Sequence, residues 1–240
     1  MEELNDILGY NLKIYQRKDW FSFSLDSVIL ANFATINFNV KRILDLGTGN
    51  GIIPLILSLR TNAKIIGVDI QQDLVDLANK SACYNNLENQ LSFKCCDIKK
   101  LFEYDKDSYD LILCNPPYFK NYQSSDKNLD IHKTIARHEV LIELEDIVSV
   151  ASKFLKEGGK FALINRTDRM IEIINLFKKY KIEPKKVRFI HKNSATASTM
   201  LFIEGMKLGR SGLKVDNPFF VYNLDGSNSL EYDKLCREVL

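Results

Sequence analysis

The chain has 240 residues, of which 45% are hydrophobic and 27% charged, and its formal net charge is only +2. A chain of this size and composition can bury one substantial core, and no run in it is long and apolar enough to cross a membrane. The five cysteines (Cys83, Cys95, Cys96, Cys114 and Cys236) form no Cys-x-x-Cys pair and have no histidine spacing suited to zinc. We therefore expect reduced thiols, a cytoplasmic protein and no metal site.

Residues 1–40 precede the first clear strand and form an N-terminal extension. Trp20, Phe21 and Phe23 cluster around Ser24, and an apolar helix follows through Phe33. Ser24 is a preferred residue for the N-cap of that helix, with the aromatic residues packing against its first turn. We expect a structural role for most of this stretch.

A short apolar strand, 42–46, leads directly into the glycine-rich loop Gly47-Thr48-Gly49-Asn50-Gly51 and then into a helix. The next strand, 64–68, ends at Asp69, about 20 residues after the first glycine, the separation at which an acidic residue reaches a ribose hydroxyl. The pattern predicts a nucleoside-binding βαβ unit, with Ile70 beside Asp69 as a further contact.

Asp45 stands immediately before this loop and restricts the ligand. The spacing Gly-x-Gly-x-Gly differs from the Gly-x-Gly-x-x-Gly that places a pyrophosphate on a helix N-terminus, and a carboxylate here would repel phosphate and attract a cation. The ligand should therefore be a nucleoside with a positive group. S-adenosylmethionine, which carries a sulfonium and an amino group, fits this requirement.

A helix is predicted over 74–86, and the strand that follows it, 91–97, ends on Asp97. At the carboxyl end of a strand in a doubly wound sheet, Asp97 would face the ligand crevice and could accept a hydrogen bond from the adenine amino group of the cofactor. The alternative is that Asp97 caps the segment 98–101.

The fourth strand, 109–114, runs into Asn115-Pro116-Pro117-Tyr118. The prolines fix φ and keep Asn115 extended, so the turn is stiff. The Asn115 side-chain oxygen and the Pro116 carbonyl can both accept hydrogen bonds from one planar NH2 group, while the Tyr118 ring offers a stacking face. We predict that these four residues form the catalytic turn and that Asn115 also borders the cofactor. The alternative is an ordinary strand-ending turn.

The remaining elements complete an α/β sheet. Helices are expected over 144–155 and 170–180, strands over 160–164, 187–190 and 199–204, and a loop at Pro184. Seven strands, mostly parallel and closed by an antiparallel C-terminal hairpin, form a Rossmann-like fold. We expect one domain over 1–240, with a core over 41–204 and a C-terminal extension over 205–240.

Two further segments point to a large substrate. Residues 119–138 form a long polar stretch directly after the turn, which suggests a substrate-side lid. Residues 151–192 hold twelve Lys or Arg against four acids, a local charge of +8, whereas the remainder carries 21 bases and 27 acids. This asymmetry favours a polyanion on one side, although solvated lysines on helix surfaces would give the same count.

The sequence resembles class I S-adenosylmethionine-dependent methyltransferases with an Asn-Pro-Pro-Tyr motif, and within them the bacterial tRNA (adenine-37-N6) methyltransferases. Four stretches carry the resemblance: residues 23–27 (Phe-Ser-Leu-Asp-Ser), 45–54, 114–119 and 136–139 (Ala-Arg-His-Glu). It implies the cofactor S-adenosylmethionine, a tRNA anticodon loop as partner, no membrane and no obligate protein partner. It also favours cofactor contact for Asp97. Many relatives carry Glu where this chain has Asp69.

The resemblance implies methyl transfer to N6 of an adenine. Three alternatives stay open. A glutamine N5-methyltransferase of release factors shares the turn but usually has a separate N-terminal helical domain, for which 40 residues are too few. A guanine-N2 rRNA methyltransferase would need the same pocket. A cofactor-binding RNA chaperone would have no use for an intact Asn115–Tyr118 turn.

Overall fold

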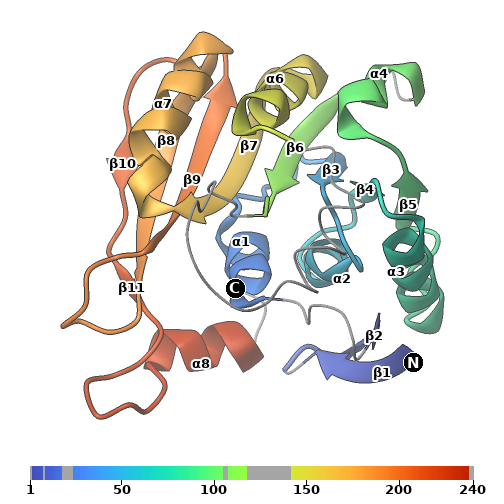
Figure 1. Cartoon of the computed structure of the whole chain (residues 1–240), viewed down its shortest axis with the longest axis horizontal. Helices are drawn as coiled ribbons and strands as arrows, with labels where there is room; N and C mark the ends of the chain where they lie inside the picture. Colours follow the sequence, from blue (N-terminus) through green and yellow to red (C-terminus); the bar gives the residue numbers. More distant parts are fainter. Residues whose placement is uncertain (1, 8, 18–23, 105–107, 118–141, 238–240) are drawn as a thin grey trace, which may run out of the picture.

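The computed structural model describes residues 2–7, 9–17, 24–104, 108–117 and 142–237. Its centre is a nine-stranded sheet. Eight of the strands lie in the order β10-β8-β9-β7-β6-β3-β4-β5, and the ninth, β11, pairs with β8 (Figure 1). Within the described ranges, no helix has both the length and the hydropathy needed to span a bilayer.

Five strands form the parallel part of the sheet: β3 (Arg42–Leu46), β4 (Lys64–Asp69), β5 (Leu91–Cys95), β6 (Tyr109–Cys114) and β7 (Leu155–Arg166). On the other side, β9 (Met200–Lys207) runs antiparallel between β7 and β8 (Ile182–His191). The predicted α/β fold with an antiparallel C-terminal pair is confirmed.

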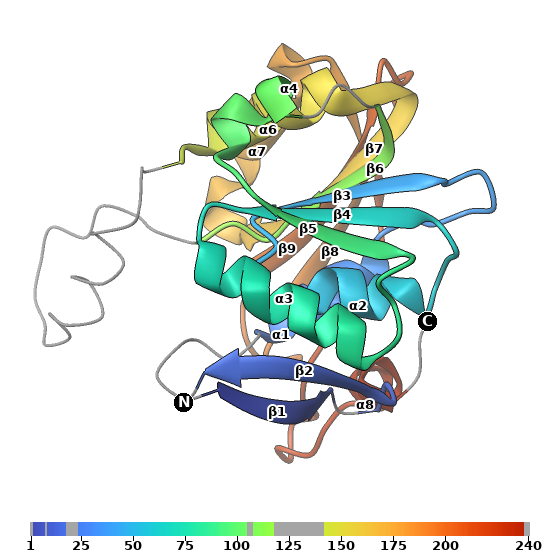
Figure 2. The same ribbon diagram turned by 90° about the vertical axis from the view of Figure 1, so that its right-hand side faces the viewer.

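Helices cover both faces of the sheet, as Figure 2 shows. One face packs against α1 (Leu25–Phe33), α2 (Ile52–Ser58) and α3 (Gln72–Tyr84), and the other against α6 (Leu144–Phe154), α7 (Met170–Lys179) and the short α4 (Leu101–Tyr104). Side chains of a strand alternate between these layers. Leu111 and Leu113 of β6 join the first core, and Ile112 and Cys114 join the second.

The terminal segments contain elements that the sequence did not reveal. Near the N-terminus, β1 (Glu2–Ile7) and β2 (Leu12–Arg17) form a separate hairpin on α3, where the Tyr15 N–H donates to Ser81 Oγ at 2.9 Å. Near the C-terminus, β10 (Lys214–Val215) and β11 (Phe219–Phe220) extend the sheet along β8, and α8 (Leu230–Arg237) follows.

Two predicted boundaries are wrong. Pro184 does not mark a loop but lies within β8, at a register shift between Pro184 and Lys186, the kind of irregularity at which a sheet tolerates a residue without an N–H. Strand β7 begins at Leu155 rather than at Lys160, because Tyr109 pairs with Leu155 before the register jumps to Leu111 and Lys160. The intervening Gly158 has a φ of 74°.

Candidate active site

The carboxyl ends of four parallel strands lie level with one another. Leu46 at the end of β3 is opposite Val68 on one side and Cys114 on the other, and Asp69 is opposite Cys95. The segments that follow these residues therefore emerge side by side at one edge of the sheet, where doubly wound folds bind ligands. They contain the glycine loop, Asp69, Asp97 and Asn115.

The glycine loop turns sharply against β4. The N–H groups of Gly47 and Thr48 both donate to Val68 O at 2.9 Å. Gly47, Gly49 and Gly51 have φ values of 70°, 56° and 85°, in the left-handed region that disfavours a side chain. A Cβ at Gly51 would lie 2.9 Å from the Phe93 ring, whereas at Gly47 and Gly49 it would meet no atom of the described residues within 4 Å. The loop is thus packed on its inner side and leaves space beside its first two glycines.

Asp69 ties this loop to the end of β4. Its Oδ2 accepts the Gly49 N–H at 2.9 Å, and its Oδ1 accepts the Gln71 N–H at 3.0 Å. Burial raises the pKa of Asp69, and these backbone donors oppose the rise. Since a carboxylate has about four acceptor sites, Asp69 retains capacity for a further donor such as a ribose hydroxyl. Ile70, which follows it, is 43% exposed and offers apolar surface next to the carboxylate.

Asp45 is fully buried, and beyond the neighbouring Thr48 hydroxyl neither of its carboxylate oxygens has a hydrogen-bond partner among the described residues. Burial raises the pKa of Asp45 to about 7; the Thr48 hydroxyl opposes the rise, and the negative charge of Asp69 adds to it. A buried carboxylate with so little compensation is costly, and a positively charged ligand would relieve the cost. The group therefore fits the ammonium group of a nucleoside cofactor, as its position in the sequence suggested.

Asp97 caps the segment that follows it, which was the alternative prediction from the sequence. It is the N-cap of the short 3-10 helix η1 (Ile98–Lys100), and its Oδ1 accepts the Lys99 N–H at 2.9 Å. One capping bond leaves acceptor capacity on the same carboxylate. Contact with the cofactor adenine remains a prediction for Asp97.

The Asn115 side chain points toward the N-terminal end of α1. Its Nδ2 donates to Ser27 Oγ at 2.9 Å and to Ser24 Oγ at 3.3 Å. Asn115 is half-buried, Pro116 is buried and Pro117 is exposed. Sequence reasoning missed the contribution of the two serines, although both fall within the stretch 23–27 that carried part of the family resemblance.

A family model described as a methyltransferase domain matches residues 38–201 of the chain. The chain belongs to this methyltransferase family. The matched range contains the glycine loop, Asp69, Asp97 and the Asn115 turn, so the edge of the sheet described above lies within the family domain.

Several curated relatives carry the name tRNA1(Val) (adenine(37)-N6)-methyltransferase. The Flavobacterium johnsoniae protein is 30% identical over 176 residues, 72% of this chain and 73% of its own length. The Flavobacterium psychrophilum protein is 27% identical over 79% of this chain and 81% of its own length. The match to the Cytophaga hutchinsonii protein, 29% identical, spans 63% of this chain and 62% of that protein. These matches confirm the resemblance found in the sequence.

Solved structures share the fold. A protein from Agrobacterium tumefaciens, described as a predicted O-methyltransferase, superposes with a TM-score of 0.71 at 18% identity over 90% of this chain and 98% of its own. A T. thermophilus 16S rRNA N2 methyltransferase in complex with AdoMet and guanosine gives a TM-score of 0.56 at 18% identity, over 86% of this chain and 50% of that chain. Both likenesses support the class I methyltransferase fold.

Some predicted site residues lie outside the described residues of this methyltransferase. They are Tyr118, the proposed lid at 119–138, the stretch 136–139 and the aromatic residues Trp20, Phe21 and Phe23. Their roles remain predictions from the sequence.

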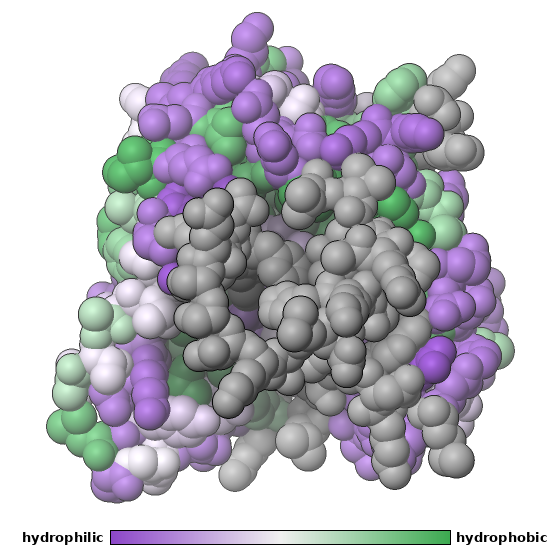
Figure 3. All heavy atoms as spheres, in the orientation of Figure 1, coloured by the Kyte–Doolittle hydropathy of each residue, from purple (hydrophilic) through white to green (hydrophobic). Residues whose placement is uncertain are grey.

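The basic segment 151–192 carries less unpaired charge than its sequence suggested. Eight of its twelve bases form ion pairs: Lys156, Lys160, Arg166, Arg169, Lys178, Lys179, Lys186 and Arg188. Five of the acids involved come from outside the segment, namely Asp110, Glu145, Glu204, Asp216 and Glu231. Hydrophilic side chains line the upper part of the face in Figure 3, over α7, α6 and α4. The local count of +8 therefore overstates the positive field at this surface.

Proposed function

We propose that this chain transfers a methyl group from S-adenosylmethionine to N6 of an adenine in tRNA, at position 37 beside the anticodon. The relatives named above, which include one at 30% identity over 72% of the chain, support the tRNA and the N6 position. The match to the Cytophaga protein spans 62% of that protein, and position 37 rests on the names of these relatives alone.

The observation that carries the proposal is the orientation of the Asn115 amide. Its NH2 group donates to Ser27 and Ser24, and its oxygen, which has two acceptor lone pairs, is the end of the amide that suits a donor from the substrate. An acceptor beside the Pro116 carbonyl suits a planar NH2 group. Hydrogen bonds from that group to Asn115 and Pro116 increase electron density on the nitrogen and aim its lone pair, which is the orientation that methyl transfer requires.

The glycine loop and three carboxylates are the residues that would hold the cofactor. Asp69 would accept the ribose hydroxyls, Asp97 the adenine amino group, and Asp45 would compensate the charge of the ammonium group, while Gly47 and Gly49 would allow close approach. The rest of the cofactor site would be formed by Thr48, Asn50, Gly51 and Ile70. When bound, S-adenosylmethionine supplies a methyl group made electrophilic by the adjacent sulfonium.

The adenine must leave its stack to reach Asn115. A base in a stacked anticodon loop exposes only its edges, so it is turned out and its two faces must then be covered. Tyr118, the last residue of the turn, is the proposed stacking partner beneath the base.

The test is methylation of valine tRNA by the purified chain with S-adenosylmethionine, followed by mass spectrometry of the nucleosides. We expect N6-methyladenosine in this tRNA and none in the same tRNA with guanine at position 37. N2-methylguanosine formed in rRNA, or a methylated glutamine in a release factor, would overturn the proposal in favour of the corresponding alternative. The matched protein control is Asn115→Ala, which should bind the cofactor but form little product.

A further inference from the structure

The Asn115 amide has two chemically different ends, and the structure shows what distinguishes them. We propose that Ser27, assisted by Ser24, is a positioning residue that holds the Asn115 amide with its NH2 group toward α1 and its oxygen toward the methyl acceptor. The inference rests on the proposed function, because it concerns how the proposed catalytic side chain is oriented.

The two serines both accept hydrogen bonds from the Asn115 NH2 group. The stronger contact is to Ser27 Oγ at 2.9 Å, and the weaker one is to Ser24 Oγ at 3.3 Å. Ser27 is only 7% exposed, so bulk water has little access to replace its hydroxyl. With the serines present, rotation of the amide by half a turn would require both hydroxyls to change from acceptors to donors, and without them that requirement is lost.

Ser24 gives independent support. It is the N-cap residue of α1, with φ −88° and ψ 154°, the extended conformation of an N-cap. A serine at this position normally accepts a hydrogen bond from a backbone N–H of the first helical turn. Here the Ser24 side chain makes no capping bond, and its hydroxyl accepts from Asn115 instead. The hydroxyl at the end of α1 is thus directed to the turn rather than to its own helix.

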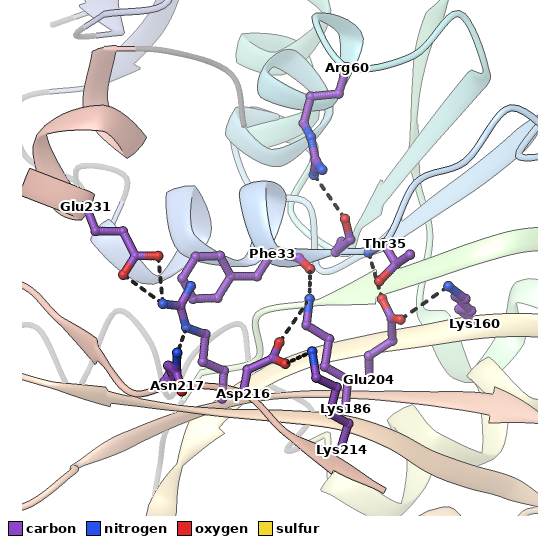
Figure 4. Close-up of polar contacts among 12 residues, drawn as sticks. Phe33, Thr35, Arg60, Lys160, Lys186, Glu204, Lys214, Asp216, Asn217 and Glu231 are labelled. Carbon is purple, nitrogen blue, oxygen red and sulfur yellow. Dashed lines mark hydrogen bonds and ion pairs between the residues drawn. The ribbon is translucent and has the colours of Figure 1, made fainter. Parts of the chain in front are cut away.

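The opposite end of α1 is fixed to the sheet, which holds the two hydroxyls in place. Arg60, just after α2, donates to the carbonyls of Ala31 and Ala34. From β8, Lys186 Nζ donates to Phe33 O at 3.0 Å (Figure 4). Just beyond the helix, Glu204 Oε2 accepts the Thr35 N–H at 2.8 Å. Cations at the C-terminus of a helix also interact favourably with its dipole. The helix therefore acts as a rigid support between β8, β9 and the catalytic turn.

This arrangement has a consequence for specificity. While its NH2 group stays on the two serines, Asn115 offers its oxygen to an amino group; it could pair with a carbonyl only if the amide turned and both serine hydroxyls became donors. Loss of Ser27 should weaken this discrimination as well as the rate.

The experiment measures single-turnover methylation of valine tRNA by Ser27→Ala and Ser24→Ala, each made in the wild-type chain and in Asn115→Ala. We expect Ser27→Ala to lower the rate about tenfold and Ser24→Ala less, both with unchanged cofactor affinity. In the Asn115→Ala background, neither serine substitution should reduce the rate further, because residues that act through one side chain are not additive. Ser27→Thr, which keeps the hydroxyl, should recover most of the rate.

Ser81→Ala is the matched control. Like Ser27, Ser81 is a buried serine within a helix whose hydroxyl accepts a hydrogen bond, here from the Tyr15 N–H, but it lies in the last turns of α3. It should methylate at the wild-type rate. A wild-type rate for Ser27→Ala, or an additive loss in the Asn115→Ala background, overturns the inference while leaving the proposed function intact. Near-wild-type methylation by Asn115→Ala overturns both. Should Ser27→Ala fail to fold, the same cycle with the exposed Ser24 decides the question.

Discussion

The Gly49 N–H donates a hydrogen bond to Asp69 Oδ2 at 2.9 Å across the carboxyl edge of the sheet. The acid that ends β4 therefore shapes the glycine loop as well as offering acceptors to a ribose. Substitution of Asp69 will change two things at once, the contacts to the cofactor and the conformation of the loop that approaches it.

Asp69→Ala should weaken S-adenosylmethionine binding by about 1.5–3 kcal/mol, the range for lost hydrogen bonds to a charged acceptor. Isothermal titration calorimetry measures the affinity, and thermal unfolding tests whether the loop change alters stability. Asp76→Ala is the control, because Asp76 lies on the exposed side of α3 and its carboxylate accepts a side-chain hydrogen bond from Gln72. Equal affinity of the folded Asp69→Ala protein and the wild type would remove Asp69 from the cofactor site.

Asp45 should make cofactor binding depend on pH. Because its pKa is raised to about 7, the carboxyl is largely protonated below neutral pH, whereas a cationic ligand favours the carboxylate. Affinity should therefore rise with pH up to about 7, by at most about tenfold per pH unit, and binding should release protons. Asp45→Asn should bind more weakly and lose this dependence. Calorimetry in buffers of different ionisation enthalpy measures the proton release, and identical pH profiles for both proteins would contradict the assignment.

The same group predicts how the stability of the ligand-free protein changes with pH. The pKa of Asp45 is higher in the folded protein than in the unfolded chain, so between about pH 4 and 7 the folded state binds more protons. The contribution of Asp45 to the free energy of unfolding must then fall as pH rises through this window and level off above it. Denaturant titrations of the wild type and Asp45→Asn across the window isolate this contribution.

How much of this site could be predicted from sequence depends on how local each signal is. The glycine loop, Asp69 and the Asn115 turn follow strands whose apolar patterns are unambiguous, and the parallel register then brings them together. The role of Asp97 was ambiguous, because a carboxylate at the end of a strand can either cap the next helix or contact a ligand. The structure shows the cap.

What could not be predicted depends on contacts between distant segments. Ser27 and Asn115 are separated by 88 residues, and no local pattern indicates that they meet. The charge of segment 151–192 was misjudged for the same reason, since the acids that pair with Lys186 and Arg188 lie in the C-terminal extension. The short strands β10 and β11 have too few residues to show a periodic pattern.

Asn115→Ala should reduce turnover about a hundredfold or more and leave cofactor affinity nearly unchanged, because the hydrogen bond matters most as the nitrogen attacks. Steady-state kinetics with valine tRNA separates kcat from KM. Tyr118→Ala should also lower the rate, through lost stacking of the base. Methylation by Asn115→Ala at close to the wild-type rate would make the turn structural.

Lys186 should matter for stability rather than for tRNA binding. Its Nζ donates to Phe33 O, lies 3.7 Å from Asp216 Oδ2 and sits 5.2 Å from the Phe202 ring centroid. Lys186→Met should lower the free energy of unfolding by about 1–3 kcal/mol, since it leaves a carbonyl at the end of α1 without its donor. Urea denaturation measures the change. Within the part of the chain that the structure describes, its neighbour Lys185 donates only to Arg210 O, on the exposed side. Lys185→Met should therefore change stability by less than about 0.5 kcal/mol.

Lys192 is the base of this segment best placed to contact tRNA. It follows the last residue of β8, and because β8 and β7 both run antiparallel to β9, the end of β8 lies at the same edge of the sheet as the Asn115 turn. Lys192 is exposed and belongs to no ion pair among the described residues, whereas Lys185 lies in the first half of β8, toward the opposite edge.

Phosphate contacts release counterions, so Lys192→Glu should weaken tRNA binding and reduce the slope of log affinity against log salt by about 1. Lys185→Glu, with the same change of charge, should have a smaller effect on both, and neither variant should alter cofactor affinity. Filter binding at several salt concentrations compares the two. If Lys192→Glu retains the wild-type slope, tRNA does not cross this end of β8, and its path must follow the other side of the Asn115 turn.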